Sequence, residues 1–473
     1  MKTDALVSAL TGTLTAAAGA AAFAWWLSLP PSYAAAERRE TPGDATGEGA
    51  RGPAVRLEGS FRASGGTPSD LRGAWPRFRG ANGDGVAADS GPIADSWPEG
   101  GPPVLWSLDL GEGHAGPAVR NGRVVVLDYD ERAPDDCLRC LSLADGREIW
   151  RRTYAVRLKR NHGMSRTVPA VSDRFVVTLG PRCHVVCADV ESGAFLWGLD
   201  LARDFGARVP LWYAGQCPLI DGETAVLAPG GKALLLGVDC RTGKILWETP
   251  NPRGWRMSHS SVMPMEFGGR RMFVYGAIGG IAGIAADGPD RGKVLWETSE
   301  WKPSVFAPSP VRLPGDRLLV TAGYGSGAML FGVSRKDGRW SVESERRFDR
   351  KELACEQHTP VFYRDCLFTV LPKDAGPGHG LLVCADLNGR HHWTSGPADR
   401  FGLGPFLIAD GKVLVLSEDG VLTMARADER AYAVLARAKV LWGRDSWAPM
   451  ALADGRLLLR DSKRMICLDL RRP

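Results

Sequence analysis

A short phrase recurs along this chain and constrains its fold more than any other feature. "KILWETP" at 244–250 and "KVLWETS" at 293–299 are nearly identical. Related phrases end at Trp106, Trp150, Trp197, Trp247, Trp296, Trp393 and Trp442. Neighbouring intact copies lie 44 to 50 residues apart, and a damaged copy, "DGRWSVE" at 337–343, fills the one gap. Eight copies at this spacing predict four-stranded propeller blades rather than a helical solenoid.

The residues of one unit also predict strands. The stretch 168–200 holds four short runs rich in Val, Phe, Leu and Trp, and Ser-Asp, Gly-Pro and Glu-Ser-Gly turns separate them. The glycine that precedes most of the Trp runs suits a tight hairpin, because glycine adopts positive φ without strain. Each run is too short for an ordinary helix. The tryptophan at its end is expected to lie buried between neighbouring sheets.

A second series of residues gives the same count of blades. Proline lacks an N–H and therefore suits the first residue of a strand. Prolines spaced by 44 to 52 residues are predicted to open the first strand of each unit: Pro117, Pro169, Pro218, Pro264, Pro310, Pro360, Pro405 and Pro449. The predicted fold is therefore all-β, an eight-bladed propeller of four-stranded antiparallel blades over residues 102–473.

The two series are out of phase at the ends of the chain. The pattern begins with a Trp strand at 103–110, and the unit that Pro449 opens stops after "MICLDL" at 465–470 without such a strand. We expect strand 103–110 to complete the last blade, because closing the ring in this way removes two exposed sheet edges.

The N-terminal region differs in composition from the repeats. Residues 5–29 carry no charge and are numerous enough to span a bilayer, and "SYAAAE" at 32–37 resembles a cleavage site. Residues 1–36 are therefore interpreted as a signal peptide or an uncleaved membrane anchor, and either would place the propeller outside the cytoplasm. Residues 37–72 are interpreted as a flexible linker, and 73–101 as a segment that leads into the propeller.

Charge and cysteine content exclude several classes of site. The net charge of +5 is spread along the chain, which argues against a nucleic-acid surface. Of the ten cysteines, Cys140, Cys187, Cys384 and Cys467 share one repeat position, where we expect a small buried hydrophobe. Local bridges within Cys137/Cys140, Cys183/Cys187 or Cys355/Cys366 stay open. "CLRCL" is neither a haem-attachment motif nor a zinc site.

The order of turn, Trp strand and "x-C-L-D" strand resembles the pyrroloquinoline quinone (PQQ)-like repeat over about 102–470. "WPRFRGANGDGVA" at 75–87 also resembles a segment found in bacterial secreted members. The resemblance implies a PQQ-like β-propeller. It leaves function open, because the family includes PQQ-dependent dehydrogenases and non-catalytic members such as the propeller lipoprotein of the outer-membrane barrel-assembly machinery.

This chain departs from both kinds of relative. It has no adjacent cysteine pair of the kind that alcohol-oxidising members carry beside the quinone, and no Glu–Asn–Asp calcium set can be matched to its positions. It also lacks the lipid-bearing cysteine of the barrel-assembly protein. We therefore expect a non-catalytic binding or scaffold propeller without a cofactor, monomeric, with a small ligand or a protein as partner. A PQQ-dependent alcohol or sugar dehydrogenase is the alternative, and a hydrolase on this scaffold is the third class.

Two glycine-rich motifs are interpreted as ordinary turns. "NGDG" at 82–85 lacks the remaining spacing of a calcium loop. "GYGSG" at 323–327 precedes no helix that would present a phosphate site, so a bulged strand or hairpin is predicted there.

The candidate site comes from the residues just before the strand-opening prolines. Equivalent strands run the same way along a propeller axis, so these lead-ins are predicted to surround one mouth of the central channel. They contain polar and aromatic residues, which are the candidate binding residues: His114, His162, Arg166, Tyr213, Gln216, His259, Gln357, His358 and Trp447. In one interpretation they cap strand ends and fill the mouth. In the other they line a pocket for a small ligand or a partner's side chain. No catalytic residue and no metal ligand is assigned.

Overall fold

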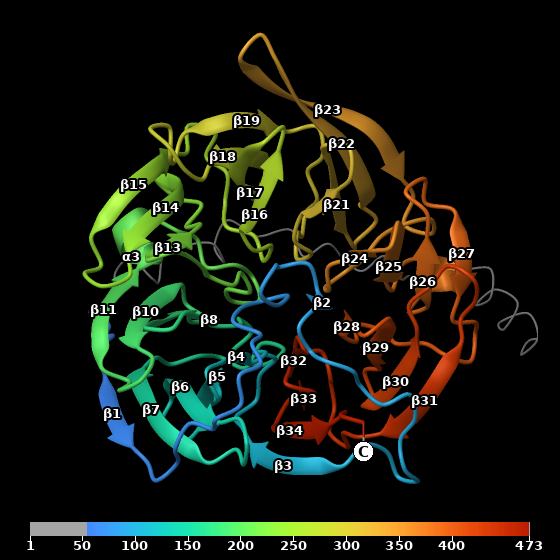
Figure 1. The fold of residues 1–473 in the computed structure, drawn as a ribbon. Coiled ribbons are helices and arrows are strands. Elements are labelled where there is room, and N and C mark those ends of the chain that lie inside the picture. Colours follow the sequence, from blue (N-terminus) through green and yellow to red (C-terminus); the bar gives the residue numbers. More distant parts are fainter. Residues whose placement is uncertain (1–53, 473) are drawn as a thin grey trace, which may run out of the picture. The chain divides into compact units, whose positions relative to one another are not determined.

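The computed structural model describes residues 54–472, whose strands form eight antiparallel blades around a central axis (Figure 1). Each blade opens with the strand nearest the axis. Blade 1 contains β4 (Ala118–Arg120), β5 (Arg123–Asp130), β6 (Asp135–Ser142) and β7 (Glu148–Ala155). Blade 2 contains β8 (Ala170–Val171), β9 (Phe175–Leu179), β10 (His184–Asp189) and β11 (Phe195–Asp200). Blade 3 contains β12 (Leu219–Asp221), β13 (Thr224–Leu227), β14 (Ala233–Asp239) and β15 (Ile245–Pro250). Blade 4 contains β16 (Met263–Phe267), β17 (Arg270–Ala277), β18 (Gly280–Ala285) and β19 (Val294–Thr298).

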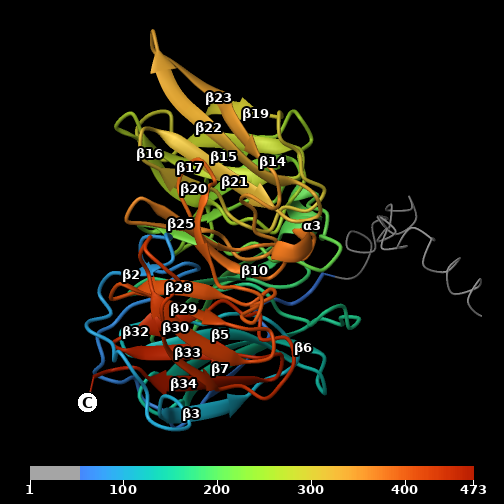
Figure 2. The same cartoon turned by 90° about the vertical axis from the view of Figure 1, so that its right-hand side faces the viewer.

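The second half of the ring continues this order. Blade 5 contains β20 (Val311–Leu313), β21 (Arg317–Ala322), β22 (Gly327–Lys336) and β23 (Arg339–Phe348), and the β22–β23 hairpin projects beyond the other blades (Figure 2). Blade 6 contains β24 (Val361–Tyr363), β25 (Cys366–Val370), β26 (Leu382–Ala385) and β27 (His391–Thr394). Blade 7 contains β28 (Phe406–Ala409), β29 (Lys412–Leu416), β30 (Val421–Arg426) and β31 (Val434–Lys439). Blade 8 contains β32 (Ala451–Ala453), β33 (Arg456–Arg460), β34 (Arg464–Asp469) and β3 (Val104–Asp109).

The strand-opening prolines lie where the sequence predicts them. Seven precede the innermost strand of their blade, and Pro264 is the second residue of β16. The eight-bladed, four-stranded architecture is thus confirmed. In the part of the chain that the structure describes, helix is confined to α3 (Leu201–Phe205) and the 3₁₀ turn η1 (Gly376–Gly378).

The repeated tryptophans join neighbouring blades. Four of them donate the indole N–H to a backbone carbonyl at the outer hairpin of the next blade: Trp106 to Leu143 at 3.0 Å, Trp150 to Val190 at 3.2 Å, Trp197 to Cys240 at 2.8 Å and Trp393 to Asp428 at 2.8 Å. The glycine of the phrase lies against the preceding tryptophan. At Gly243, which has φ of +73°, a Cβ would come within 2.7 Å of the Trp197 ring. Only glycine satisfies both the turn and this contact, which explains why the phrase recurs.

One predicted outer strand lies elsewhere. The phrase ending at Trp442 was expected to form the outer strand of blade 7, but that strand is β31, and Trp442 follows it with 82% of its surface exposed. The pairing of β30 with β31 includes a bulge between Met424 and Ala425, as in the other blades, so the strand position is the regular one. β31 includes the first three residues of the phrase, 437–439, and ends before its Val-Leu-Trp.

Strand β3 pairs antiparallel with β34, and Trp106 lies opposite Cys467. The last blade therefore combines three strands from the end of the chain with one strand that precedes all the others. That this pairing is needed to hold the ring together stays a prediction.

Residues 73–101 pass over the inner strands of several blades. Trp75 exchanges both backbone hydrogen bonds with Val119 of β4, and Val171 of β8 donates to the Pro76 carbonyl at 2.8 Å. Farther along, β2 (Val86–Ala87) adds a parallel strand to β28. The "NGDG" turn holds Gly83 and Gly85 at positive φ, in agreement with its interpretation as a turn.

The predicted linker 37–72 is described only from residue 54 onward. That part includes β1 (Ser60–Ala63), which pairs with β7 as a fifth strand of blade 1. Residues 60–63 are thus an ordered sheet edge rather than a free tether. The predicted signal peptide or anchor lies outside the described residues, so its boundaries stay a prediction. Among residues 54–472 no helix is long and apolar enough to cross a membrane.

All ten cysteines are buried and free of disulfides. The four that share the repeat position lie in β6, β10, β26 and β34 with no exposed surface, as expected for small hydrophobes. None of the three local pairs is bridged. Apolar side chains of adjacent blades pack together at the seams, as Trp197 of blade 2 does with Val238 of blade 3.

Candidate functional site

The segments before the inner strands surround one end of the axis, which we call the mouth. All eight inner strands lie in equivalent positions, so the lead-ins reach the same face of the ring (Figure 1). The mouth can be divided by how its lead-ins are tied together.

In five consecutive blades a hydrogen-bond relay links the lead-ins. The backbone N–H of Val168 donates to Cys217 Sγ at 3.2 Å, and the Cys217 N–H donates to Ser261 Oγ at 3.0 Å. The relay continues from the Ser261 N–H to Ser309 Oγ at 3.0 Å, and from the Ser309 N–H to Thr359 Oγ1 at 2.8 Å. Each step satisfies a buried donor of one blade with a side chain of the next. We call blades 2 to 6 the relay arc.

The remaining three blades cannot continue this relay. The residues before their prolines are Gly404, Ala448 and Gly116, which have no side-chain acceptor. At Gly116 a Cβ would come within 2.5 Å of the Pro449 carbonyl oxygen, so the backbones of blades 8 and 1 approach directly. We call blades 7, 8 and 1 the open arc.

Three of the predicted site residues serve the scaffold. The buried Gln216 side chain donates to the Tyr275 hydroxyl at 3.1 Å and accepts the N–H of Ala228 at 3.2 Å. The Tyr213 hydroxyl donates to the Lys159 carbonyl at 2.7 Å. The Arg166 guanidinium donates to the carbonyls of Trp212, Asn161 and His162. These contacts fit the interpretation that lead-in side chains cap strand ends.

Two other predicted residues meet in the open arc. The His114 ring stacks on the Trp447 indole, with centroids 4.9 Å apart and planes inclined by 28°. His114 Nδ1 and Trp447 Nε1 are both buried, and neither finds a hydrogen-bond partner among residues 54–472. The neighbouring Ser446 Oγ is in the same state. Buried polar atoms without a protein partner occur elsewhere among residues 54–472 as well, but here three of them lie together, where water or a further group could bind.

Burial and nearby cations lower the pKa of His114 and of His259, so both rings are neutral at pH 7. Burial and then the charges of Arg166 and Arg460 lower the pKa of His114 to about 3. Burial and the charge of Arg166 lower the pKa of His259 to about 4. The guanidinium of Arg166 therefore lies close to both rings, which come from blades 1 and 4.

The last predicted residues differ in exposure. His358 is buried, and its Nε2 atom has no partner in the described part of the chain. Burial lowers the pKa of His358 to about 4. Hydrogen bonds with the backbones of Trp447 and Leu403 act in the opposite direction but are outweighed. His162 is exposed at positive φ, and Gln357 is half-buried. Whether any of these residues binds a ligand stays a prediction.

Beside Trp447, the mouth contains two aromatic residues and one basic residue that the sequence did not single out: Trp212, Tyr324 and Lys373. Trp212 lies 6.1 Å from both the His259 ring and the Tyr324 ring, and its plane is nearly parallel to that of Tyr324. Lys373 lies 5.6 Å over the Trp447 ring. We call Trp212, Tyr324, Lys373 and Trp447 the aromatic rim. Trp212 directly precedes Tyr213, so its place in the same lead-in could have identified it from the sequence. Tyr324 lies in the turn of the β21–β22 hairpin, as predicted for "GYGSG".

The residues below the mouth belong to the segment 73–101. The buried Arg79 guanidinium donates to four backbone carbonyls: those of Gly83, Asp84, Thr359 and Pro360. Burial lowers its pKa to about 10, so it stays charged at neutral pH. Arg79 thus ties this segment to the last residues of the relay arc.

A cleft of about 660 Å³ opens beside the mouth, between the loop after β31 and the hairpin that joins β33 to β34. Trp442 and Arg160 lie on its wall, and Arg160 is paired with Glu112 at 2.8 Å. The exposed indole of Trp442 thus extends the aromatic surface outward from the open arc.

Two guanidinium groups of this region are already occupied, and binding of PQQ stays an open alternative. The guanidinium groups of Arg79 and Arg166 already bind backbone carbonyls, so they are not free to hold the quinone carboxylates. Within residues 54–472, the one cluster of three or more His, Cys, Asp or Glu ligand atoms lies at the seam of blades 6 and 7, in β25, β27 and the β30–β31 hairpin, away from the lead-ins. The mouth is suited to stacking and to hydrogen bonding with an uncharged or carbonyl-bearing group.

Comparison with known proteins supports the repeat assignment. Residues 134–351 match a family model described as outer membrane protein assembly factor BamB. The resemblance to PQQ-like repeats is thereby confirmed from β6 of blade 1 to the end of blade 5. No curated protein matches the chain.

Solved structures share the fold at low sequence identity. BamB from Moraxella catarrhalis is 13% identical, with a TM-score of 0.50 over 78% of this chain and 99% of that one. The computationally designed Ika8 protein is 12% identical, with a TM-score of 0.52 over 77% and 99%. The quinohemoprotein alcohol dehydrogenase ADHIIG from Pseudomonas putida HK5 is 14% identical, with a TM-score of 0.55 over 84% and 80%. These proteins include an assembly factor and an enzyme, so the likeness shows the propeller fold alone.

Proposed function

We propose that this chain is a non-catalytic, extracytoplasmic binding propeller that holds a segment of a protein partner at the open arc of its mouth. The observation that carries the proposal is the group of buried, unpartnered polar atoms on His114, Ser446 and Trp447. The Trp447 N–H is a donor, and serine and neutral imidazole can each donate or accept. A peptide backbone offers the matching carbonyls and amides.

The aromatic rim supports a protein segment rather than a compact metabolite. Tyr324 is 52% exposed, and its ring continues the surface of Trp212. Aromatic side chains with one polar edge are enriched at protein interfaces, where they supply large contact area at small entropic cost. Lys373 adds a cation beside Trp447, which favours a segment with a carboxylate.

The extracytoplasmic location rests on the uncharged stretch 5–29 and on the family match to an outer membrane protein assembly factor. The partner would accordingly be a secreted or membrane-associated protein. In the second form of this proposal, a small ligand instead of a protein segment binds the polar atoms of His114, Ser446 and Trp447.

Site-specific photo-cross-linking in the native host tests the proposal. A benzophenone amino acid at Tyr324 is expected to yield a defined protein adduct. Leu246 on the outer strand of blade 3 has a similar exposed fraction, 47%, and serves as the matched control position. Adducts of equal yield from both positions, or none from Tyr324, would count against binding at the mouth.

The alternative is a quinone-dependent oxidoreductase. One of the solved structures with a similar fold is a quinohemoprotein alcohol dehydrogenase. Purified protein would be incubated with PQQ and calcium, and dye reduction measured with several alcohols and aldose sugars. We expect no turnover above a protein-free control. Substantial turnover would replace the binding proposal with the enzyme.

A further inference from the structure

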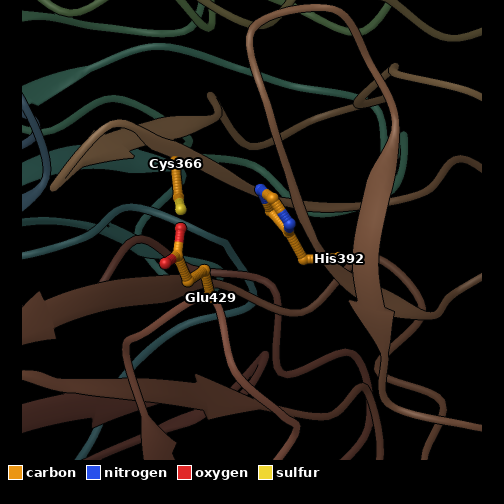
Figure 3. A group of neighbouring side chains, drawn as sticks. All are labelled: Cys366, His392 and Glu429. Carbon is orange, nitrogen blue, oxygen red and sulfur yellow. The ribbon is translucent and has the colours of Figure 1, made fainter.

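A second cluster of chemistry-bearing residues lies at the seam between blades 6 and 7, on the face opposite the mouth. It consists of Cys366 at the start of β25, His392 in β27, and Glu429 in the hairpin between β30 and β31. One ligand atom from each residue lies within 4.8 Å of the other two. Figure 3 shows the Cys366 thiol directed toward the Glu429 carboxylate, with the His392 ring beside them.

The other blades show that His392 is unusual at its position. In blade 6 Cys384 pairs with Trp393 and Ala385 pairs with His391, so His392 is the extra residue of a β-bulge. The same bulge occurs in the other blades, and in six of them the extra residue is aliphatic: Leu105, Ile149, Leu196, Leu246, Leu295 and Leu435. Bulges redirect a side chain, and here the redirected group is an imidazole.

Cys366 also departs from the repeat. It is the first residue of the second strand in its blade, directly after the inner hairpin. Five other blades have a cation there: Arg123, Arg270, Arg317, Lys412 and Arg456. Blade 3 has Thr224. A buried thiol thus replaces a basic residue in the same blade in which an imidazole replaces a leucine.

The backbone that carries Glu429 is fixed against blade 6. Trp393, next to His392, donates its indole N–H to the carbonyl of Asp428 at 2.8 Å, and Tyr432 packs on the Trp393 ring with centroids 5.6 Å apart. Neither the His392 ring nor the Glu429 carboxylate makes a hydrogen bond or ion pair with other residues in the described range. Both groups are therefore free to bind a common ligand.

From this juxtaposition we infer that Cys366, His392 and Glu429 form a zinc site that joins blade 6 to blade 7. Thiolate, imidazole and carboxylate together are the donor set that Zn²⁺ accepts, whereas calcium and magnesium prefer oxygen alone. Tetrahedral zinc would hold its ligand atoms about 3.5 Å apart, which the exposed Glu429 side chain can reach by rotation. With three protein ligands, the fourth position would be open to water.

Cobalt binding provides the test, because Co²⁺ occupies zinc sites and gives a charge-transfer band when a thiolate is bound. Metal-free full-length protein would be titrated with Co²⁺ and then with Zn²⁺. We expect the thiolate-to-cobalt band to appear and Zn²⁺ to abolish it. Absence of the band at millimolar cobalt would overturn the inference.

The repeat itself supplies variants that should fold. His392→Leu restores the residue found in most other blades, and Cys366→Thr introduces the residue of blade 3. Both are expected to retain the melting temperature of the metal-free protein, while zinc affinity falls by at least about tenfold. Glu429→Gln should weaken binding less. Unchanged zinc affinity in His392→Leu, with the fold intact, would contradict the site.

Discussion

The relay arc and the open arc occupy equivalent positions of one ring but use their side chains differently. From Val168 to Thr359, each lead-in is tied to the next by a side chain that accepts a buried N–H. Around Gly116, the backbones touch directly. Here Ser446 Oγ and Trp447 Nε1 have no hydrogen-bond partner among residues 54–472, and such atoms also occur beside the relay, at Ser165, Ser260 and His358.

This difference separates two uses of repeated polar residues. A side chain that completes a neighbouring blade contributes to stability and has no remaining capacity for a ligand. A polar atom left buried and unpaired costs stability until something binds it. The comparison fits scaffold roles for Gln216 and Tyr213, and it supports the proposal that His114 and Trp447 bind a partner.

The largest effect is expected from removing the strand that completes the open arc. A variant beginning at Gly111 lacks both β3 and the segment 73–101, so β34 becomes an exposed edge. We expect it to aggregate or to lose cooperative thermal unfolding, as followed by circular dichroism. A variant beginning at Gly73 keeps both elements and should melt close to the full-length protein. Similar melting of the two variants would show that closure by β3 is dispensable.

Arg79→Met tests the attachment of the segment 73–101 to the relay arc. It leaves four backbone carbonyls without their buried donor, so we expect the free energy of unfolding to fall by about 4 kcal/mol. Urea denaturation measures this change. The control is Arg62→Met, because the Arg62 side chain is 65% exposed and its ion pair with Glu148 should contribute little. If Arg79→Met lowers the free energy of unfolding by less than about 1 kcal/mol, Arg79 does not hold the segment 73–101 to the relay arc.

The neutral histidine of the open arc predicts a pH dependence. His114 has a pKa of about 3 in the folded protein and an ordinary value near 6.5 when unfolded. Between these values the unfolded chain binds the proton and the folded chain does not, so stability is lost as the pH falls below about 6.5. Between pH 7 and pH 4.5, the free energy of unfolding should fall by about 2 kcal/mol less in His114→Gln than in the wild type, because glutamine does not titrate. His162→Gln, at an exposed position, should follow the wild type, and parallel pH profiles for all three proteins would refute the assignment.

The smallest effects compare single hydroxyl groups in the two arcs. Thr359→Val and Ser309→Ala each remove the acceptor of a buried N–H and should cost about 1 to 2 kcal/mol. Ser446→Ala removes a hydroxyl without a partner among the described residues and should change stability by less than about 0.5 kcal/mol or raise it. Equal losses in both arcs would end the distinction between them.

The fold was accessible from the sequence because its signals repeat. Pro360 and Trp393 each belong to a series of residues that occupy equivalent places in the blades. Their contacts are local, within one strand or with the adjacent blade. Trp442 was misplaced because its phrase matches the pattern, whereas β31 ends at Lys439, three residues before the tryptophan. The role of residues 73–101 was not predictable, because Arg79 bonds to carbonyls some 280 residues away in sequence.

The candidate site was only partly accessible. The prolines located the mouth, but they did not report which lead-in side chains are already bonded. Gln216 and Trp447 look equivalent as polar lead-in residues, and only their neighbours across the seam separate them. Tyr324 enters the mouth from a hairpin turn rather than from a lead-in, so proline spacing gave no signal for it. His392 resembled an ordinary variant of the Trp phrase until the bulge register was known.

The central claim, that a partner bound at the mouth depends on the unpaired polar groups of the open arc and not on the relay, is tested most directly by the cross-link yield from Tyr324, on a blade 5 hairpin at the mouth, in two matched backgrounds. Trp447→Phe keeps an aromatic ring beside His114 but is smaller and lacks the indole N–H, whereas Ser309→Ala perturbs the relay. The account predicts that Trp447→Phe lowers the adduct yield about tenfold while Ser309→Ala leaves it near the wild-type level. A yield that falls in Ser309→Ala and persists in Trp447→Phe would contradict it.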